Sequence, residues 1–247
     1  EVPMNRQLLA GLPVIVALLS PLWMELPSWA AEVDNPPAEA PIKRARPSAE
    51  VMAVVVKGRA LRNAGDLDGG RAAFEDALAK ARAAKDVAGE SLALNNVASI
   101  YRYQAGLTSI APNQSPPADL IGKSADLYAQ AVKAARAVGD KFDEGYATLY
   151  LGVLAAGKGN ADQAFKHYDD ALTIFKALDD RYYTARTFMF MGSTTLYHRK
   201  QAEASLKHFE QALPLFRDAK YWNEAQWVVR DMDVAYEQLM AQAKGQR

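Results

Sequence analysis

The sequence contains no cysteine. This absence excludes disulfide bonds, thiolate catalysis, cysteine-ligated metals and a lipidated cysteine. A chain of this kind that is exported must be stable through packing alone.

The sequence also lacks an excess of charge of either sign, with 29 basic and 29 acidic residues among 247. Nucleic acid and anionic membranes attract proteins through a concentrated basic field. The balance therefore disfavours both as partners.

Catalytic and metal-binding patterns are missing as well. The histidines are His167, His198 and His208, and none has a second histidine or a glutamate at metal-ligand spacing. Gly157-Lys158-Gly159 is too short for a phosphate-binding loop. The pairs Asp169-Asp170 and Asp179-Asp180 are interpreted as solvated surface, because adjacent residues point to different helix faces. We predict no enzyme activity, no cofactor and no metal.

The first 30 residues are predicted to be a signal peptide. Met4-Asn5-Arg6-Gln7 gives a short positive start, Leu8 to Met24 is uncharged, and Ser28-Trp29-Ala30 places small residues where a signal peptidase cleaves. The alternative is an uncleaved membrane anchor, for which this stretch is short and contains prolines. Export points to a bacterial periplasm, or to the thylakoid lumen of a photosynthetic source, with no membrane contact after cleavage. Residues 31–47 are proline-rich and predict a disordered linker.

A pattern that returns about every forty residues dominates the rest of the chain. A small residue lies in one helix, at Gly58, Ala98, Gly152 and Gly192. An aromatic residue lies in the next helix, with an alanine three positions after it. The aromatic–alanine pairs are Phe74 and Ala77, Tyr128 and Ala131, Tyr168 and Ala171, and Phe209 and Ala212.

The hydrophobic periodicity predicts helices in pairs. The expected ranges are 51–63 and 66–85, 88–105 and 118–138, 142–158 and 161–178, 182–199 and 202–219, and an unpaired 222–243. Two antiparallel helices approach closely only where a side chain is small, and the aromatic fills the wedge between neighbouring pairs. The middle step between small residues is longer, 54 residues against 40 on either side. An inserted loop at 107–117 accounts for the difference.

These residues resemble the tetratricopeptide repeat family, in a long-period variant similar to the kinesin-light-chain-like repeats. The resemblance implies an all-α, right-handed α-solenoid. Its repeats would be residues 48–86, 87–140, 141–180 and 181–221. Residues 222–247 would form a capping helix and tail, with Trp222 and Trp227 in the core or the cap.

The same resemblance implies a protein or peptide partner bound on a concave face lined by the first helix of each pair. Asn96 matches the asparagine of the family's carboxylate clamp, but Tyr146 and Tyr150 stand at other clamp positions. An internal peptide segment or a folded partner is therefore expected in place of a C-terminus. The predicted lining residues are Arg59, Arg62, Asn95, Asn96, Ser99, Arg102, Tyr103, Tyr146, Tyr150, Arg186, Met189 and Tyr197.

Overall fold

A computed structural model describes residues 44–112 and 114–245, and these residues form nine α-helices and no strand. The predicted signal peptide and residues 31–43 of the predicted linker lie outside this range. The helices are α2 (Ala49–Asn63), α3 (Leu67–Ala83), α4 (Val87–Gln104), α5 (Ala118–Val138), α6 (Lys141–Gly157), α7 (Ala161–Ala177), α8 (Arg181–Tyr197), α9 (Ala202–Asp218) and α10 (Trp222–Gly245).

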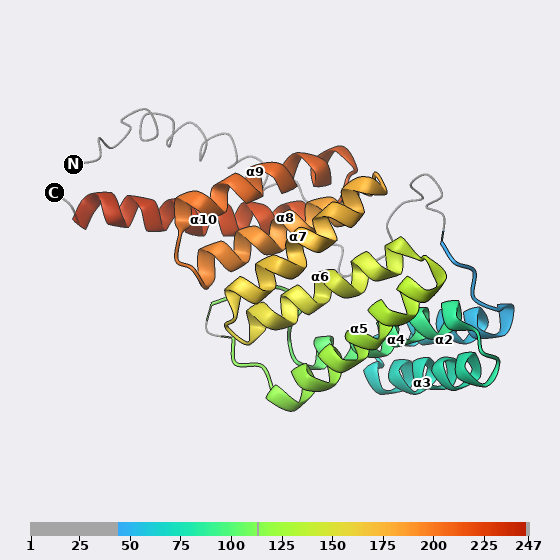
Figure 1. The fold of residues 1–247 in the computed structure, drawn as a ribbon. Coiled ribbons are helices and arrows are strands. Elements are labelled where there is room, and N and C mark those ends of the chain that lie inside the picture. The colour runs from blue at the N-terminus through green and yellow to red at the C-terminus, as the bar shows by residue number, and fades with distance from the viewer. Residues whose placement is uncertain (1–43, 113, 246–247) are drawn as a thin grey trace. The chain divides into compact units, whose positions relative to one another are not determined.

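The helices form a stack of antiparallel pairs (Figure 1). The most extensive contacts are α2 with α3, α4 with α5, α6 with α7, and α8 with α9. The first helix of each pair also contacts the first helix of the next pair, from α2 to α4, α6 and α8. The helical solenoid predicted from the sequence is confirmed.

The repeated small residue lies directly against the repeated aromatic ring. A Cβ atom built on Gly58, Gly152 or Gly192 would come within 2.6, 2.5 or 2.4 Å of the ring of Phe74, Tyr168 or Phe209, respectively. A side chain at these positions would therefore occupy the space of the ring. The ring lies between pairs too, because Tyr168 on α7 stacks on Phe190 of α8 at 6.5 Å.

Aspartate caps begin the first helix of three successive pairs. Asp86, Asp140 and Asp180 precede α4, α6 and α8, and one oxygen of each accepts a backbone N–H three residues on, at 2.8 or 2.9 Å. Such caps satisfy N–H groups that have no partner within the helix. The interpretation of Asp180 as solvated surface is wrong, because only 4% of the residue is exposed.

The inserted loop between α4 and α5 is tied to the inner helices. Leu107 in the loop is fully buried, and its side chain lies against Gly157 at the end of α6. Its carbonyl accepts a hydrogen bond from Nη1 of Arg102 at 2.5 Å. The loop thus closes over the ends of two first helices.

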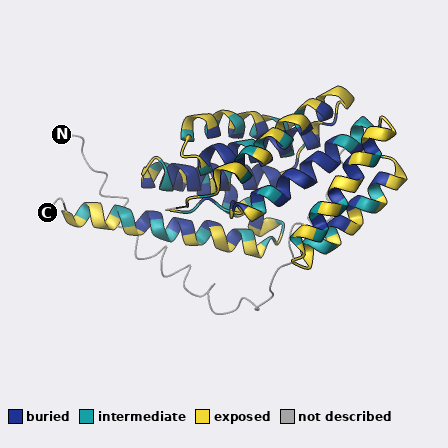
Figure 2. Ribbon diagram, turned by 90° about the horizontal axis from the view of Figure 1, so that it is seen from below, coloured by how far each residue is buried: buried dark blue, intermediate teal, exposed yellow. Residues whose placement is uncertain are grey.

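The last helix covers the fourth pair with one face. Figure 2 shows buried and exposed residues alternating along α10, which ends beside the mark C. Val228, Met232 and Tyr236 are buried, as expected of a capping helix. The two tryptophans are not part of the core, because Trp222 is 47% exposed and Trp227 is 37% exposed.

Candidate functional site

The predicted lining residues come from α2, α4, α6 and α8 and are linked to one another. Arg59 on α2 donates through Nε to Oδ1 of Asn96 on α4 at 3.5 Å. Tyr146 and Tyr150 on α6 contact each other at a ring distance of 4.7 Å. The Arg186 guanidinium on α8 lies 5.8 Å from the Tyr150 ring. The structure therefore brings together residues from four repeats along one surface, which we call the inner surface.

Arg102 is the most enclosed of the predicted residues. It is fully buried, and its guanidinium lies over the rings of Tyr103 at 4.5 Å and Tyr150 at 4.2 Å. Burial on this scale is unusual for arginine unless other groups compensate its charge. Arg102 therefore orders the aromatic side chains around it and holds the inserted loop.

Arg59 and Arg62 on α2 are both half-buried. Burial lowers the pKa of the Arg59 guanidinium, and the charge of Arg62 lowers it further. Arg62 donates to Oδ1 of its neighbour Asn63 at 3.2 and 3.3 Å. Its guanidinium also lies 5.9 Å from the ring of Tyr103. Both arginines therefore lie on the α2 part of the inner surface, near Asn96 and Tyr103.

Other predicted residues have a packing role that the structure makes visible. Ser99 donates to the carbonyl of Asn96 at 2.7 Å and is fully buried, and Met189 is buried with 3% exposure. Asn95 donates to the carbonyl of Asp143 at 3.3 Å. Tyr197 donates to Asp231 on α10 at 2.9 Å and so anchors the capping helix.

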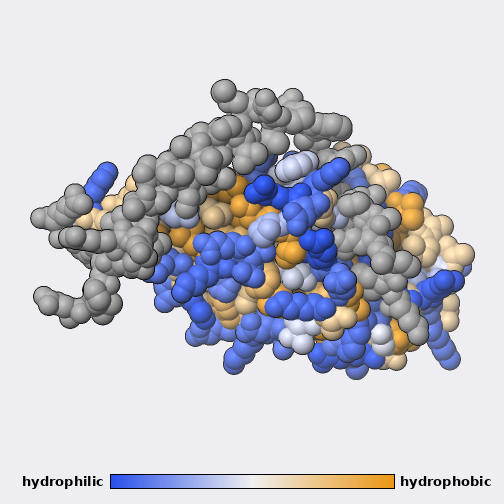
Figure 3. All heavy atoms as spheres, turned by 90° about the horizontal axis from the view of Figure 1, so that it is seen from above, coloured by the Kyte–Doolittle hydropathy of each residue, from blue (hydrophilic) through white to orange (hydrophobic). Residues whose placement is uncertain are grey.

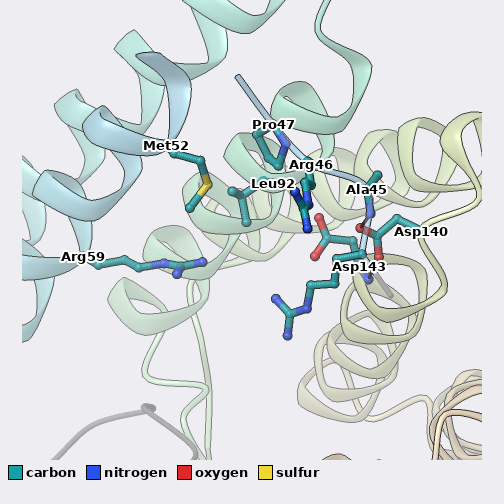
Figure 4. Close-up of a pocket in the computed structure, with 9 residues that line it drawn as sticks. Ala45, Arg46, Pro47, Met52, Arg59, Leu92, Asp140 and Asp143 are labelled. Atoms are coloured by element: carbon teal, nitrogen blue, oxygen red, sulfur yellow. Dashed lines mark hydrogen bonds between the residues drawn. The ribbon is translucent and has the colours of Figure 1, made fainter. Parts of the chain in front are cut away.

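A cavity of about 320 Å³ opens at the α2 end of the inner surface (Figure 4). Met52 and Arg59 from α2 lie on one side of it, and Asp143 of α6 with its cap Asp140 lies on the other. Leu92 of α4 contributes between them. The extended segment Arg44–Pro47 completes the lining.

Asp143 is the chemically unusual group of this cavity. Burial, together with the nearby charge of Asp140, raises the pKa of the Asp143 carboxyl to about 6. Arg44, Arg59 and a hydrogen bond from Ser91 act in the opposite direction. The carboxyl thus changes its charge around pH 6, in a cavity that arginine side chains also line.

Asp140, Asp143 and the segment Arg44–Pro47 were not predicted from the sequence as part of this surface. A signal was present, because an aspartate stands immediately before the first helix of each of three pairs, at 86, 140 and 180. Figure 3 shows apolar residues in patches separated by polar ones on the face it presents. Within the described ranges, no group of histidine, aspartate and glutamate side chains could hold a metal ion.

Comparisons with known proteins agree with the fold. Residues 145–218, which cover most of α6 through α9, match the family model described as tetratricopeptide repeat. The fold is similar to the crystal structure of a STAND protein (signal transduction ATPase with numerous domains) with a tetratricopeptide repeat sensor from Pyrococcus horikoshii. The TM-score is 0.59 at 15% sequence identity, over 76% of this chain and 27% of that one. This likeness concerns the fold alone, and the chain spans about a quarter of that protein. A search of curated proteins found no match.

Proposed function

We propose, from the tetratricopeptide repeat match of residues 145–218, that the chain is a non-catalytic adaptor or complex-assembly factor. It binds a peptide segment or a protein partner along the inner surface. The observation that supports this most is the convergence of arginine, asparagine and tyrosine side chains from α2, α4, α6 and α8. Aromatic and arginine side chains are enriched where proteins bind proteins.

The proposal includes export to an extracytoplasmic compartment, a bacterial periplasm or a thylakoid lumen. It rests on the charge pattern and the small residues of positions 4–30. The second candidate is a scaffold tethered to the membrane by an uncleaved N-terminal segment. Among the helices of residues 44–112 and 114–245, none is long and apolar enough to cross a membrane. N-terminal sequencing separates the two, because cleavage yields a chain that begins at Ala31.

The binding role is tested with two matched double variants of the full chain. Arg59→Ala with Tyr103→Ala removes half-buried groups of the inner surface. Arg71→Ala with Tyr101→Ala removes the same residue types, also half-buried, from positions on α3 and α4 that are not among the lining residues. Each variant serves as bait in an extract of the native compartment, and captured proteins are identified by mass spectrometry.

We expect a partner that the parent and the Arg71/Tyr101 variant retain and that the Arg59/Tyr103 variant loses. A partner lost equally from both variants would contradict binding on the inner surface. Capture of no partner by the parent would contradict the adaptor role itself. Circular dichroism of both variants shows whether the fold is intact.

A further inference from the structure

The segment that precedes α2 is bound by the aspartate caps of the next two first helices. The backbone N–H of Ala45 donates to Oδ2 of Asp140 at 3.0 Å, and that of Ser48 donates to Oδ2 of Asp86 at 2.7 Å. The other oxygen of each carboxylate caps its own helix. Each cap therefore has two functions, one toward its helix and one toward an extended chain.

The spacing of these bonds matches an extended chain that crosses one repeat. Ala45 and Ser48 are three residues apart, and residues 44–48 form neither helix nor strand. Ser48, the N-cap of α2, has φ −59° and ψ 151°, values that also occur in a polyproline II helix. That helix has three residues per turn, so every third N–H faces the same side. Pro47 has no N–H, and it lies between the two donating residues at a position that bonds to neither cap.

Charge and stacking add to the backbone bonds. The guanidinium of Arg44 lies 3.4 Å from the centre of the Phe142 ring on α6. Its positive charge acts to lower the pKa of the carboxyls of Asp143 and Asp180, against the larger effect of burial. This end of the inner surface thus holds an arginine side chain beside a row of aspartates.

Residues 44–47 are bound at this site but do not fill the cavity. Arg44 and Arg46 are exposed, Ala45 and Pro47 are half-buried, and the cavity of about 320 Å³ remains beneath them. Ser48 belongs to the start of α2, where its hydroxyl accepts from the N–H of Val51. Residues 44–47 can therefore dissociate from the cavity while the hydrogen bond between Ser48 and Asp86 remains and anchors the start of α2.

We propose that Arg44–Pro47 is a tethered occupant of a docking site for extended, arginine-bearing peptides, and that a partner segment of this chemistry displaces it. The partner places its arginine on Phe142 and the N–H of its next residue on Oδ2 of Asp140. It also places a side chain in the cavity. This inference rests on the proposed peptide-binding role of the inner surface and names the chemistry of the peptide.

The test uses the full chain and a fluorescein-labelled peptide with the sequence of residues 43–47, Lys-Arg-Ala-Arg-Pro. Arg44→Ala with Ala45→Pro removes the guanidinium that stacks on Phe142 and the N–H that donates to Asp140. The double variant therefore releases residues 44–47 from the site. A tethered segment competes at an effective concentration in the millimolar range. Fluorescence polarisation should therefore show at least fivefold tighter binding of the peptide to this variant than to the parent.

Two further substitutions in the released variant locate the site. Asp140→Asn keeps a residue that caps helices as well as aspartate but removes the charge, and it should weaken peptide binding at least tenfold. Asp66→Asn is the matched control. Asp66 caps α3 through the N–H of Gly69 at 2.8 Å and is not among the residues that line the cavity. Binding should not change in this control, and melting curves confirm that both variants fold.

Equal peptide binding by the parent and the released variant would overturn the proposal, and so would full binding by the Asp140→Asn variant. Loss of binding from the Asp66→Asn control would overturn it as well. Failure of the peptide to bind, with a partner still lost from the Arg59/Tyr103 variant, would refute this site and leave the proposed function standing. Failure of both experiments would refute both.

Discussion

The close contact between a glycine and an aromatic ring sets how each helix pair packs. Gly152→Ala would place a Cβ 2.5 Å from the fully buried ring of Tyr168. Alanine favours a helix over glycine by about 1 kcal/mol, but overpacking of a core costs about 1–3 kcal/mol. We expect a net loss of up to about 2 kcal/mol in the free energy of unfolding, measured by urea denaturation.

Gly122 provides the matched control for this substitution. It lies within α5, and a Cβ built on it has no atom within 4 Å. Gly122→Ala should therefore stabilise the protein by up to about 1 kcal/mol. If both substitutions change the free energy of unfolding in the same direction, the close contact between the small residue and the aromatic ring is contradicted.

The buried carboxyl of Asp143 gives a second prediction at this scale. Its folded pKa of about 6 lies above the value near 4 of an unfolded chain. The native state thus binds the proton more tightly. The stability that this contributes is present below about pH 4 and is lost as pH rises through 6. Asp140, Arg44 and Arg59 are the charged groups that act on it.

Asp143→Asn removes the titrating group. We expect the stability of the variant relative to the parent to rise by at most about 3 kcal/mol between pH 4 and 6 and then to stay constant. Thermal unfolding across this range provides the measurement. Asp126→Asn, at an exposed site on α5, is the control substitution. If the difference in stability between Asp143→Asn and the parent does not change with pH, this carboxyl lies in solvent and the prediction is wrong.

Among the elements, the nine helices of the described residues could be predicted from the sequence to within two residues at each end. The hydrophobic periodicity indicates which face of each helix is buried, and a turn with glycine or aspartate indicates where a helix ends or begins. The helix expected at 66–85, for example, is α3 at Leu67–Ala83. Gly65 ends the preceding turn with φ 88°, and Asp66 caps α3.

The inner surface could be predicted only as a set of helix faces. Tyr197 was assigned to binding, yet its hydroxyl is used by Asp231 of α10, 34 residues away. Trp222 and Trp227 were expected in the core or the cap because of their size, and both lie partly exposed on the capping helix. The hydrophobic pattern along one helix predicts which of its residues are buried. It does not predict which side chains of the neighbouring helix contact them.

The cavity with its bound segment could not be predicted for a related reason. Ala45 and Asp140 are 95 residues apart, and no local period connects them. Only the stacking of α2, α4 and α6 brings the linker end, the caps and Met52 to one place. Each aspartate lies directly before a first helix, but its second hydrogen bond requires a donor that lies elsewhere in the chain.

Within the described residues, each helix contacts almost only the helices that neighbour it in the stack. Among the described helices, α10 contacts α9 and α8, so a change in α10 should affect the C-terminal pair first. Asp231 is the link, with 3% exposure. It accepts hydrogen bonds from Ser193 at 2.7 Å and from Tyr197 at 2.9 Å on α8.

Asp231→Ala removes the carboxylate that both hydroxyls donate to. Ser193 can still donate to the carbonyl of Met189 at 3.1 Å, and Tyr197 is half-buried, so we expect a loss of about 1 kcal/mol in the free energy of unfolding. Hydrogen–deuterium exchange should become faster in α8, α9 and α10 and stay at the parent rate in α2, α3 and α4. Glu237→Ala, at an exposed position of the same helix, is the control and should change neither region. If exchange instead rises evenly across all repeats, the stack unfolds as one cooperative unit, and the nearest-neighbour description is wrong.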